Sequence, residues 1–276
     1  MPDPCRDNKT TWVPTPAVRL SIGFHAALLV AAAVMPTQWR WLLAAFVCNH
    51  LLLGAFGMWP RSALLGPNLS RLPESGRACI ALTFDDGPDP EITPQILDLL
   101  DQHDAKASFF CIGKRAAACP HIVTEIIRRG HSVENHSNNH PIGFAFYSLG
   151  ALRREVTRGQ ATLSEISGTT PRFFRAPFGL RSPLLAPVTA KVPLCYVSWT
   201  RRGYDSVSRS PEKVLRRITR GLAAGDILLL HDTAMSRTGR GTPVVLDVLP
   251  RLLEQLEASG LRAVSLPLAL PEHPMP

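Results

Sequence analysis

The stretch Leu82–Pro90, "LTFDDGPDP", places two neighbouring acids where a strand-like apolar run ends and a Gly-Pro turn begins. Like charges this close repel each other, so the pair needs a compensating partner or a chemical task. The run at 78–84, "ACIALTF", is short, apolar and bounded by turn residues, which is typical of a buried parallel strand. We therefore expect Asp85 and Asp86 at the tip of a buried strand.

After this first strand, strand-like runs and helical patterns alternate along the chain. The further strand-like runs lie at 106–112, 131–136, 171–177, 193–199, 226–231 and 261–266. The helical patterns lie at 93–103, 121–130, 148–168, 181–190, 211–223 and 243–259. Regular alternation predicts parallel β/α architecture, either a barrel or an open sheet. In both architectures the functional residues gather at the carboxyl ends of the strands.

Several polar residues follow these expected strands and would meet at one rim. They are His136 and His140 after the third strand, Arg175 after the fourth, Trp199 and Asp205 after the fifth, and His231 at the end of the sixth. One carboxylate and two imidazoles suit zinc or another divalent ion and leave coordination positions open. One acid of the pair would then hold the ion and the other would act as general base. Taken without the histidines, the acids Asp85 and Asp86 also fit a magnesium site or a cap of the following helix.

The first sixty residues contain two apolar runs, at 20–35 and 41–59. A spanning helix needs about 20 apolar residues, so we expect two membrane helices joined by the short link "PTQWR". A single span, with the first run as a signal sequence, and a hydrophobic helical cap are the alternatives. The expected divisions are a polar leader at 1–17, the helices at 18–59, a connector along the membrane surface at 60–77, a catalytic domain at 78–268 and a tail at 269–276.

Charge and cysteine content bear on partners and compartment. The net charge of +8 comes mainly from scattered arginines, while aromatics make up 7% and no stacking motif occurs, so we expect membrane lipids and no nucleic acid as partners. The link between the apolar runs is less basic than either flank, which favours an inner-membrane protein with its catalytic domain in the cytoplasm. The six cysteines form no CxxC pair and are interpreted as unpaired thiols, in agreement with that side.

The motifs "TFDDGP", "HSNNH", "RAPFG", "SWTRRGYD" and "LLLHD" appear in this order. Their order resembles the five motifs of the NodB-like polysaccharide deacetylases, carbohydrate esterase family 4, over residues 78–268. The resemblance implies a distorted (β/α) barrel after the helical hairpin and one divalent metal ion, zinc in the first place, with cobalt or nickel as alternatives. It also implies the roles of the central residues: Asp85 as catalytic base, Asp86, His136 and His140 as metal ligands, Arg175 as the partner that orients the base, and His231 as general acid.

The same resemblance implies roles for the surrounding residues. The Phe178 N–H would bind the oxyanion, although the family commonly has tyrosine there, and Leu229 would line an acetyl-sized pocket. Asp205 would orient His231, but Ser206 follows it where many members have tryptophan, and Trp199 would supply an apolar wall. We further hypothesise that Arg181 and Arg202 contact a phosphate of the substrate, with solvated surface charge as the alternative for both.

The sequence thus predicts hydrolysis of the amide of an N-acylated amino sugar in a polysaccharide, oligosaccharide or lipid-linked glycan, with release of acetate. The hydrophobic hairpin favours a lipid-linked substrate. The alternatives are a deformylase of a lipid-linked formamido sugar, an outward-facing deacetylase of peptidoglycan or chitooligosaccharide, and a non-catalytic sugar-binding or scaffold protein. The sugar, the acyl group, the metal and the oligomeric state stay open.

Overall fold

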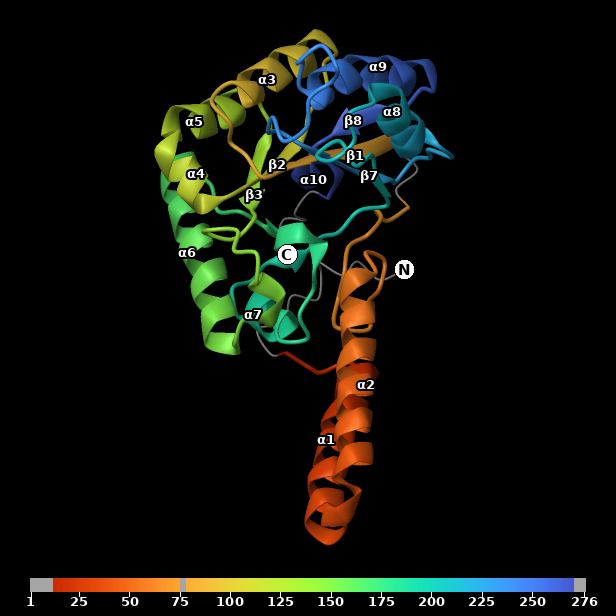
Figure 1. Ribbon diagram of the computed structural model, residues 1–276. Helices are drawn as coiled ribbons and strands as arrows, with labels where there is room; N and C mark the ends of the chain where they lie inside the picture. The colour runs from red at the N-terminus through yellow and green to blue at the C-terminus, as the bar shows by residue number, and fades with distance from the viewer. Residues whose placement is uncertain (1–11, 75–77, 271–276) are drawn as a thin grey trace.

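The computed structural model describes residues 12–74 and 78–270, which form a helical hairpin and a β/α domain (Figure 1). The helices of the hairpin are α1 (Pro16–Val34) and α2 (Trp39–Met58), joined by the short η1 (Pro36–Gln38). The helices of the domain are α3 (Ile92–Gln102), α4 (Gly113–Ala118), α5 (Pro120–Arg128), η2 (Phe144–Phe146), α6 (Leu149–Ser167), η3 (Pro177–Gly179), α7 (Leu185–Lys191), α8 (Pro211–Thr219), α9 (Val244–Ala258) and α10 (Leu266–Ala269).

The domain is built around one parallel sheet. Its strands are β1 (Cys79–Asp85), β2 (Ser108–Cys111), β3 (Ser132–Asn135), β4 (Phe173–Phe174), β5 (Cys195–Tyr196), β6 (Arg201–Arg202), β7 (Ile227–His231) and β8 (Arg262–Val264). They run in the order β5-β4-β3-β2-β1-β7-β6, and β8 also pairs with β1. The curled sheet with helices around it (Figure 1) confirms the predicted distorted (β/α) barrel behind an N-terminal helical hairpin.

Strand β1 shows how the sequence separates the outer and inner faces of the sheet. Ile80, Leu82 and Phe84 are fully buried in the large cluster beneath the helices, while Ala81 belongs to a smaller cluster with Phe110 of β2. Successive strand residues point to opposite faces. Burying a side chain such as Phe84 contributes about 1.5–3 kcal/mol. By the same alternation Asp85, which ends β1, points to the inner face with Ala81.

Several residues of the predicted connector pack into the domain between positions 60 and 72. Leu65 and Leu69 are each 1% exposed. Leu69 pairs with Val197 in parallel register: its N–H donates to Tyr196 O at 2.9 Å, and Ser198 N–H donates to Leu69 O at 3.0 Å. These bonds cover the open edge of β5. The segment therefore contributes to the packing of the domain, and its expected place along a membrane surface stays a prediction.

The hairpin projects from the domain as two antiparallel helices (Figure 1). Both helices are long and apolar enough to cross a membrane, and only 6% of each apolar window is buried. A core helix of a soluble protein would be mostly buried. The few polar groups bond to each other, since Asn49 Nδ2 donates to Ser21 Oγ at 2.9 Å. Such contacts hold helices together inside a bilayer.

The cysteines depart from the prediction at one position. Cys48, Cys79, Cys111 and Cys119 are free thiols, but Cys195 is disulfide-bonded. The prediction that all cysteines are unpaired is therefore wrong at Cys195. Disulfides persist in oxidising compartments. The cytoplasmic orientation stays a prediction, and it now rests on the charge of the flanking segments alone.

Candidate active site

The two acids at the tip of β1 point in different directions because their backbones differ. Asp85 continues the inner face of the strand and is 4% exposed, and its Oδ1 accepts a 2.6 Å bond from Arg175 Nη1. Asp86 has a φ of 77°, in the left-handed region that non-glycine residues rarely adopt. This conformation turns its carboxylate toward the loop after β3. Backbone strain of this kind costs about 1–3 kcal/mol and persists where the surroundings enforce it.

Asp86 meets the two histidines of that loop. Asp86 Oδ1 lies 3.1 Å from His140 Nε2 and 3.4 Å from His136 Nε2. One ligand atom from each of the three residues falls within 4.8 Å of the others. Metal–ligand bonds of about 2.0–2.2 Å in tetrahedral geometry separate ligand atoms by distances of this size. The carboxylate–imidazole set therefore fits a divalent ion, and the structure brings together all three predicted ligands.

The hydrogen bonds of His136 leave its outer nitrogen free for an ion. Its Nδ1 lies 2.8 Å from Arg175 O, and because a carbonyl only accepts, Nδ1 must carry the proton. In the neutral imidazole Nε2 is then the unprotonated nitrogen, and it faces Asp86, as in metal sites whose histidines are held by an outer partner. The pKa of His140 is lowered to about 4 by burial and by the neighbouring His136. Burial alone would raise the pKa of Asp86, but His136 and the other nearby imidazoles hold it below its ordinary value.

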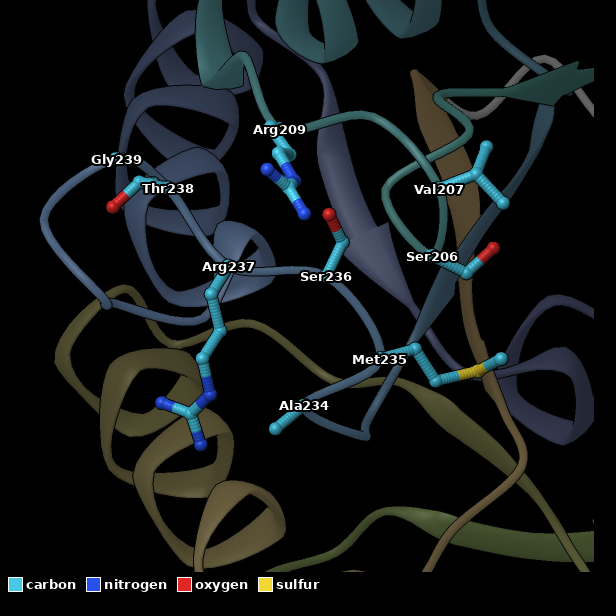
Figure 2. Close-up of a pocket in the computed structure, with 9 residues that line it drawn as sticks. All are labelled: Ser206, Val207, Arg209, Ala234, Met235, Ser236, Arg237, Thr238 and Gly239. Atoms are coloured by element: carbon cyan, nitrogen blue, oxygen red, sulfur yellow. The ribbon is translucent and has the colours of Figure 1, made fainter.

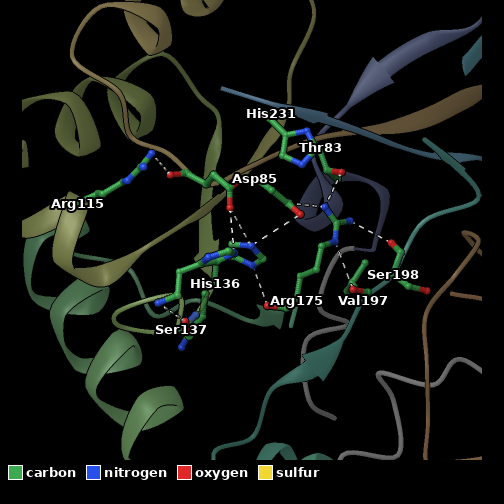
Figure 3. Close-up of polar contacts among 12 residues, drawn as sticks. Thr83, Asp85, Arg115, His136, Ser137, Arg175, Val197, Ser198 and His231 are labelled. Atoms are coloured by element: carbon green, nitrogen blue, oxygen red, sulfur yellow. Dashed lines mark hydrogen bonds and ion pairs between the residues drawn. The ribbon is translucent and has the colours of Figure 1, made fainter. Parts of the chain in front are cut away.

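Arg175 is completely buried beside Asp85 and is held by several hydrogen bonds (Figure 3). Its Nη1 donates to Asp85 Oδ1 and to Thr83 Oγ1 at 2.9 Å, and its Nη2 donates to Ser198 O at 3.0 Å. The guanidinium also lies 4.1 Å from the centre of the Phe110 ring. A buried charge needs such pairing to offset its desolvation. The carboxylate of Asp85 is therefore held by a rigid partner.

His231 ends β7 beside Asp85 and is held by Asp205 through two bonds. Asp205 Oδ2 accepts the His231 backbone N–H at 2.8 Å, and Oδ1 lies 3.0 Å from Nδ1. Burial disfavours the imidazolium, but the charges of Asp205, Asp85 and Asp86 outweigh burial and raise the pKa of His231 to about 9. The imidazole is thus protonated near neutrality, and the structure unites the two residues although Ser206 departs from the family pattern.

The loop after β4 places Phe178 above the histidines. Its φ is 59°, its ring lies 4.6 Å from the His140 ring, and 47% of its surface is exposed. Among the described residues the Phe178 N–H has no hydrogen-bond partner, so it is free to donate to a substrate oxygen. Leu229 lies two residues before His231 on the inner face of β7 and is 1% exposed.

The guanidinium of Arg202 lies over the Trp199 ring. Trp199 is 8% exposed, and its ring centre lies 6.0 Å from the guanidinium of Arg175 and 5.4 Å from that of Arg202. Gly179 is required opposite this ring, because a Cβ there would lie 2.2 Å from the Trp199 side chain. Arg202 is only half-buried, so its charge is available at the rim.

Arg181 does not join the other residues, and its predicted substrate contact is corrected by its position. It is 6% exposed, its Nη2 donates to Pro67 O at 2.8 Å, and its guanidinium lies 4.4 Å from the Tyr196 ring centre. Its backbone N–H donates to Gly57 O at 3.1 Å. Arg181 therefore ties the connector and the end of α2 to the domain.

Three further residues support the site, and the motif analysis assigned none of them a role in the reaction, although Thr83 and Asp232 lie within the quoted motifs. Thr83 shares the inner face of β1 with Asp85, which the two-residue period of the strand would have indicated. Arg115 Nη1 donates to Asp86 O at 2.8 Å and supports the strained turn. Asp232 Oδ2 accepts from Thr93 Oγ1 at 2.7 Å and packs against Gly87, where a Cβ would lie 1.9 Å from it. That close approach explains the glycine after the two acids.

Comparisons with known proteins find relatives of this chain. The family model for polysaccharide deacetylases matches residues 73–197. A peptidoglycan-N-acetylglucosamine deacetylase of Bacillus cereus is 32% identical over 191 residues, covering 69% of this chain and 68% of that protein. A chitooligosaccharide deacetylase of Azorhizobium caulinodans is 32% identical over 198 residues, covering 69% of this chain and 94% of that protein.

The fold matches as well. The crystal structure of a peptidoglycan N-acetylglucosamine deacetylase bound to a naphthalenyl benzamide compound superposes with a TM-score of 0.67 at 30% identity, covering 73% of this chain and 92% of that chain. The motifs, the barrel and the relatives lead to one conclusion. The chain belongs to the polysaccharide deacetylase family.

Proposed function

We propose that this protein is a metal-dependent hydrolase that removes the acetyl group from an N-acetylated amino sugar of a glycan and releases acetate. The observation that carries the proposal is the division between the neighbouring acids of β1. Asp85 is paired with Arg175, whereas Asp86 faces His136 and His140. One acid is thereby available as a base and the other as a ligand.

Asp86, His136 and His140 would hold the ion. A divalent ion bound there supplies a Lewis acid for the amide carbonyl and lowers the pKa of water to about 7. Asp85 accepts the proton of the attacking water, and Arg175 holds its carboxylate in place by a charge-assisted hydrogen bond.

The remaining residues act on the two ends of the amide. The free N–H of Phe178 donates to the carbonyl oxygen as negative charge develops on it. His231, held protonated by Asp205, donates its proton from Nε2 to the leaving nitrogen. Leu229 and Trp199 exclude water on the side where the acetyl methyl group would lie.

We also propose that the glycan is reached at a membrane surface. The loop that carries Phe178 is tied to the end of α2 through the bond between Arg181 N–H and Gly57 O, 3.1 Å long. A Cβ at Gly57 would lie 2.2 Å from Arg181 O, so the two backbones are in direct contact. An active site fixed to the foot of an apolar hairpin favours a lipid-linked amino sugar over a freely diffusing oligosaccharide.

The test is mass spectrometry of products after the full-length protein, reconstituted in lipid vesicles with zinc, cobalt or nickel, is incubated with candidate glycans. We expect loss of an acetyl group, formation of a free amine and release of acetate, and we expect chelation to stop the reaction. Release of formate from a formamido sugar would instead identify the deformylase alternative. No product from any N-acylated sugar, by protein that retains its metal, would favour the non-catalytic alternative.

A further inference from the structure

A groove lies beside the candidate active site, between the loops at 206–209 and 234–239. Its volume is about 610 Å³, and Figure 2 shows the lining side chains. They include two arginines and three hydroxyl groups, namely Arg209, Arg237, Ser206, Ser236 and Thr238. Nothing in the hydrolysis described above uses these residues, so the groove is available for another part of the substrate.

The groove adjoins the catalytic acid. Ser206 follows Asp205, which binds His231, and Ala234 comes three residues after His231. The two walls are linked, because Ser236 Oγ donates to Ser208 O at 3.0 Å. A ligand in the groove would therefore lie next to the amino sugar that reacts, between walls held in fixed register.

The charges that face the groove are positive and lack acidic partners. Among the described residues, neither Arg209 nor Arg237 has a carboxylate within ion-pair distance; Arg237 Nη1 only donates to Gly241 O at 2.8 Å. The two acids closest to Arg209 in sequence have other partners, since Asp205 binds His231 and Glu212 binds Ser210 and Arg251. In Figure 2 the Arg209 guanidinium turns toward the Ser236 hydroxyl, while the Arg237 side chain extends away from both.

Two further arginines lie over aromatic rings close in sequence to Asp205 and add to the positive charge. Arg202 lies over Trp199 at 5.4 Å and over Tyr204 at 5.1 Å, and Arg217 lies over the same Tyr204 ring at 5.7 Å. The Nε of Arg202 is buried without a hydrogen-bond partner among the described residues. Both guanidinium groups thus lie close to the same ring, and an anion bound there would accept charge-assisted hydrogen bonds.

We propose that this groove binds an anionic substituent, a phosphate or a carboxylate, on the glycan next to the reacting amino sugar. Guanidinium groups bind both anions through paired, charge-assisted hydrogen bonds, and serine and threonine hydroxyls complete the shell. The inference rests on the proposed function, because it assumes that the occupant belongs to the same glycan. A phosphate corresponds to a lipid-linked sugar, and a carboxylate corresponds to a muramic-acid glycan.

The test measures binding of sugars that already lack the acetyl group and so cannot react. Isothermal titration calorimetry of the full-length, metal-loaded protein would compare glucosamine 1-phosphate, muramic acid and neutral glucosamine. The key variant is R209Q/R237Q. The matched control is R216Q/R240Q, which removes the same charge from exposed arginines of α8 and of the loop that do not line the groove.

We expect the wild type to bind at least one anionic sugar about tenfold more tightly than glucosamine, as one or two charge-assisted bonds provide. R209Q/R237Q should lose this preference and R216Q/R240Q should keep it.

Preference for the phosphate alone indicates the lipid-linked source, and equal preference for the carboxylate indicates the muramic-acid source. An anion preference retained in both double variants would place the anion at the metal and overturn the proposal. Absence of any preference in the wild type would also overturn it. Because no turnover is measured, failure of the hydrolase proposal would be seen separately, in the product analysis.

Discussion

The two sides of the catalytic edge satisfy their polar groups in opposite ways. Around β1, β3 and β7 the charged groups are buried and paired, as Asp85 is with Arg175 and His231 is with Asp205. Around the groove, Arg209 is exposed and has no acidic partner among the described residues. The first arrangement fixes atoms for a reaction, and the second leaves charge available to a ligand.

This difference predicts where mutations act. Removing one member of a buried pair leaves an uncompensated charge and costs about 3–5 kcal/mol of stability. An exposed charge contributes only about 0–1 kcal/mol. We therefore expect changes on the paired side to affect both turnover and folding, whereas changes on the arginine side should affect ligand binding with little change in stability.

The largest change in turnover on an intact metal site is expected for His231→Ala. Loss of a general acid lowers kcat by about 10²–10⁴-fold. His231 is not a ligand in this account, so the variant should still bind the ion. Steady-state kinetics and metal analysis of the same preparation check both statements, with the wild type as control. A variant that lost its metal together with its activity would contradict the assignment.

A smaller effect, specific to pH, is expected for Asp205→Asn. The Asp205 carboxylate helps to raise the pKa of His231 to about 9, above its ordinary value near 6.5. The amide removes that charge, so the imidazole loses its proton at lower pH. The alkaline limb of the kcat profile should then move toward lower pH, with activity best preserved on the acidic side. An alkaline limb that stayed in place would show that Asp205 does not control the proton on His231.

The smallest effects belong to the arginine side. There R209Q/R237Q should weaken anion binding about tenfold, as described above, while the thermal unfolding of the protein stays close to that of the wild type. Strong destabilisation by these two changes would contradict the difference between the two sides, because it would mean that the groove arginines have structural partners.

Much of the paired side could be predicted from the sequence. Asp85, Arg175 and His231 each follow a short apolar run, and parallel strands bring such positions to one edge. The order of five motifs then assigned them roles. Asp86 was recognised as the second acid, but its left-handed backbone, which turns it toward the histidines, depends on contacts with Arg115 and with the packed Gly87 turn.

The remainder depended on three-dimensional packing. Arg181 was misassigned because a charged residue beside a motif resembles a ligand contact, whereas its guanidinium is buried against Tyr196 and Pro67 O. The role of the connector was missed because Leu69 makes its strand-like bonds to a segment more than a hundred residues away. The groove was missed because its arginines occur in two loops that carry no common motif.

The central claim is that the two acids of β1 have different tasks, and metal content tests it most directly. Asp85→Asn and Asp86→Ala would be purified in parallel, loaded with zinc and analysed by inductively coupled plasma mass spectrometry. The account predicts that Asp85→Asn binds the ion as the wild type does but is nearly inactive, whereas Asp86→Ala does not retain it. Equal metal content in the two variants, or loss of the ion from Asp85→Asn alone, would contradict the account.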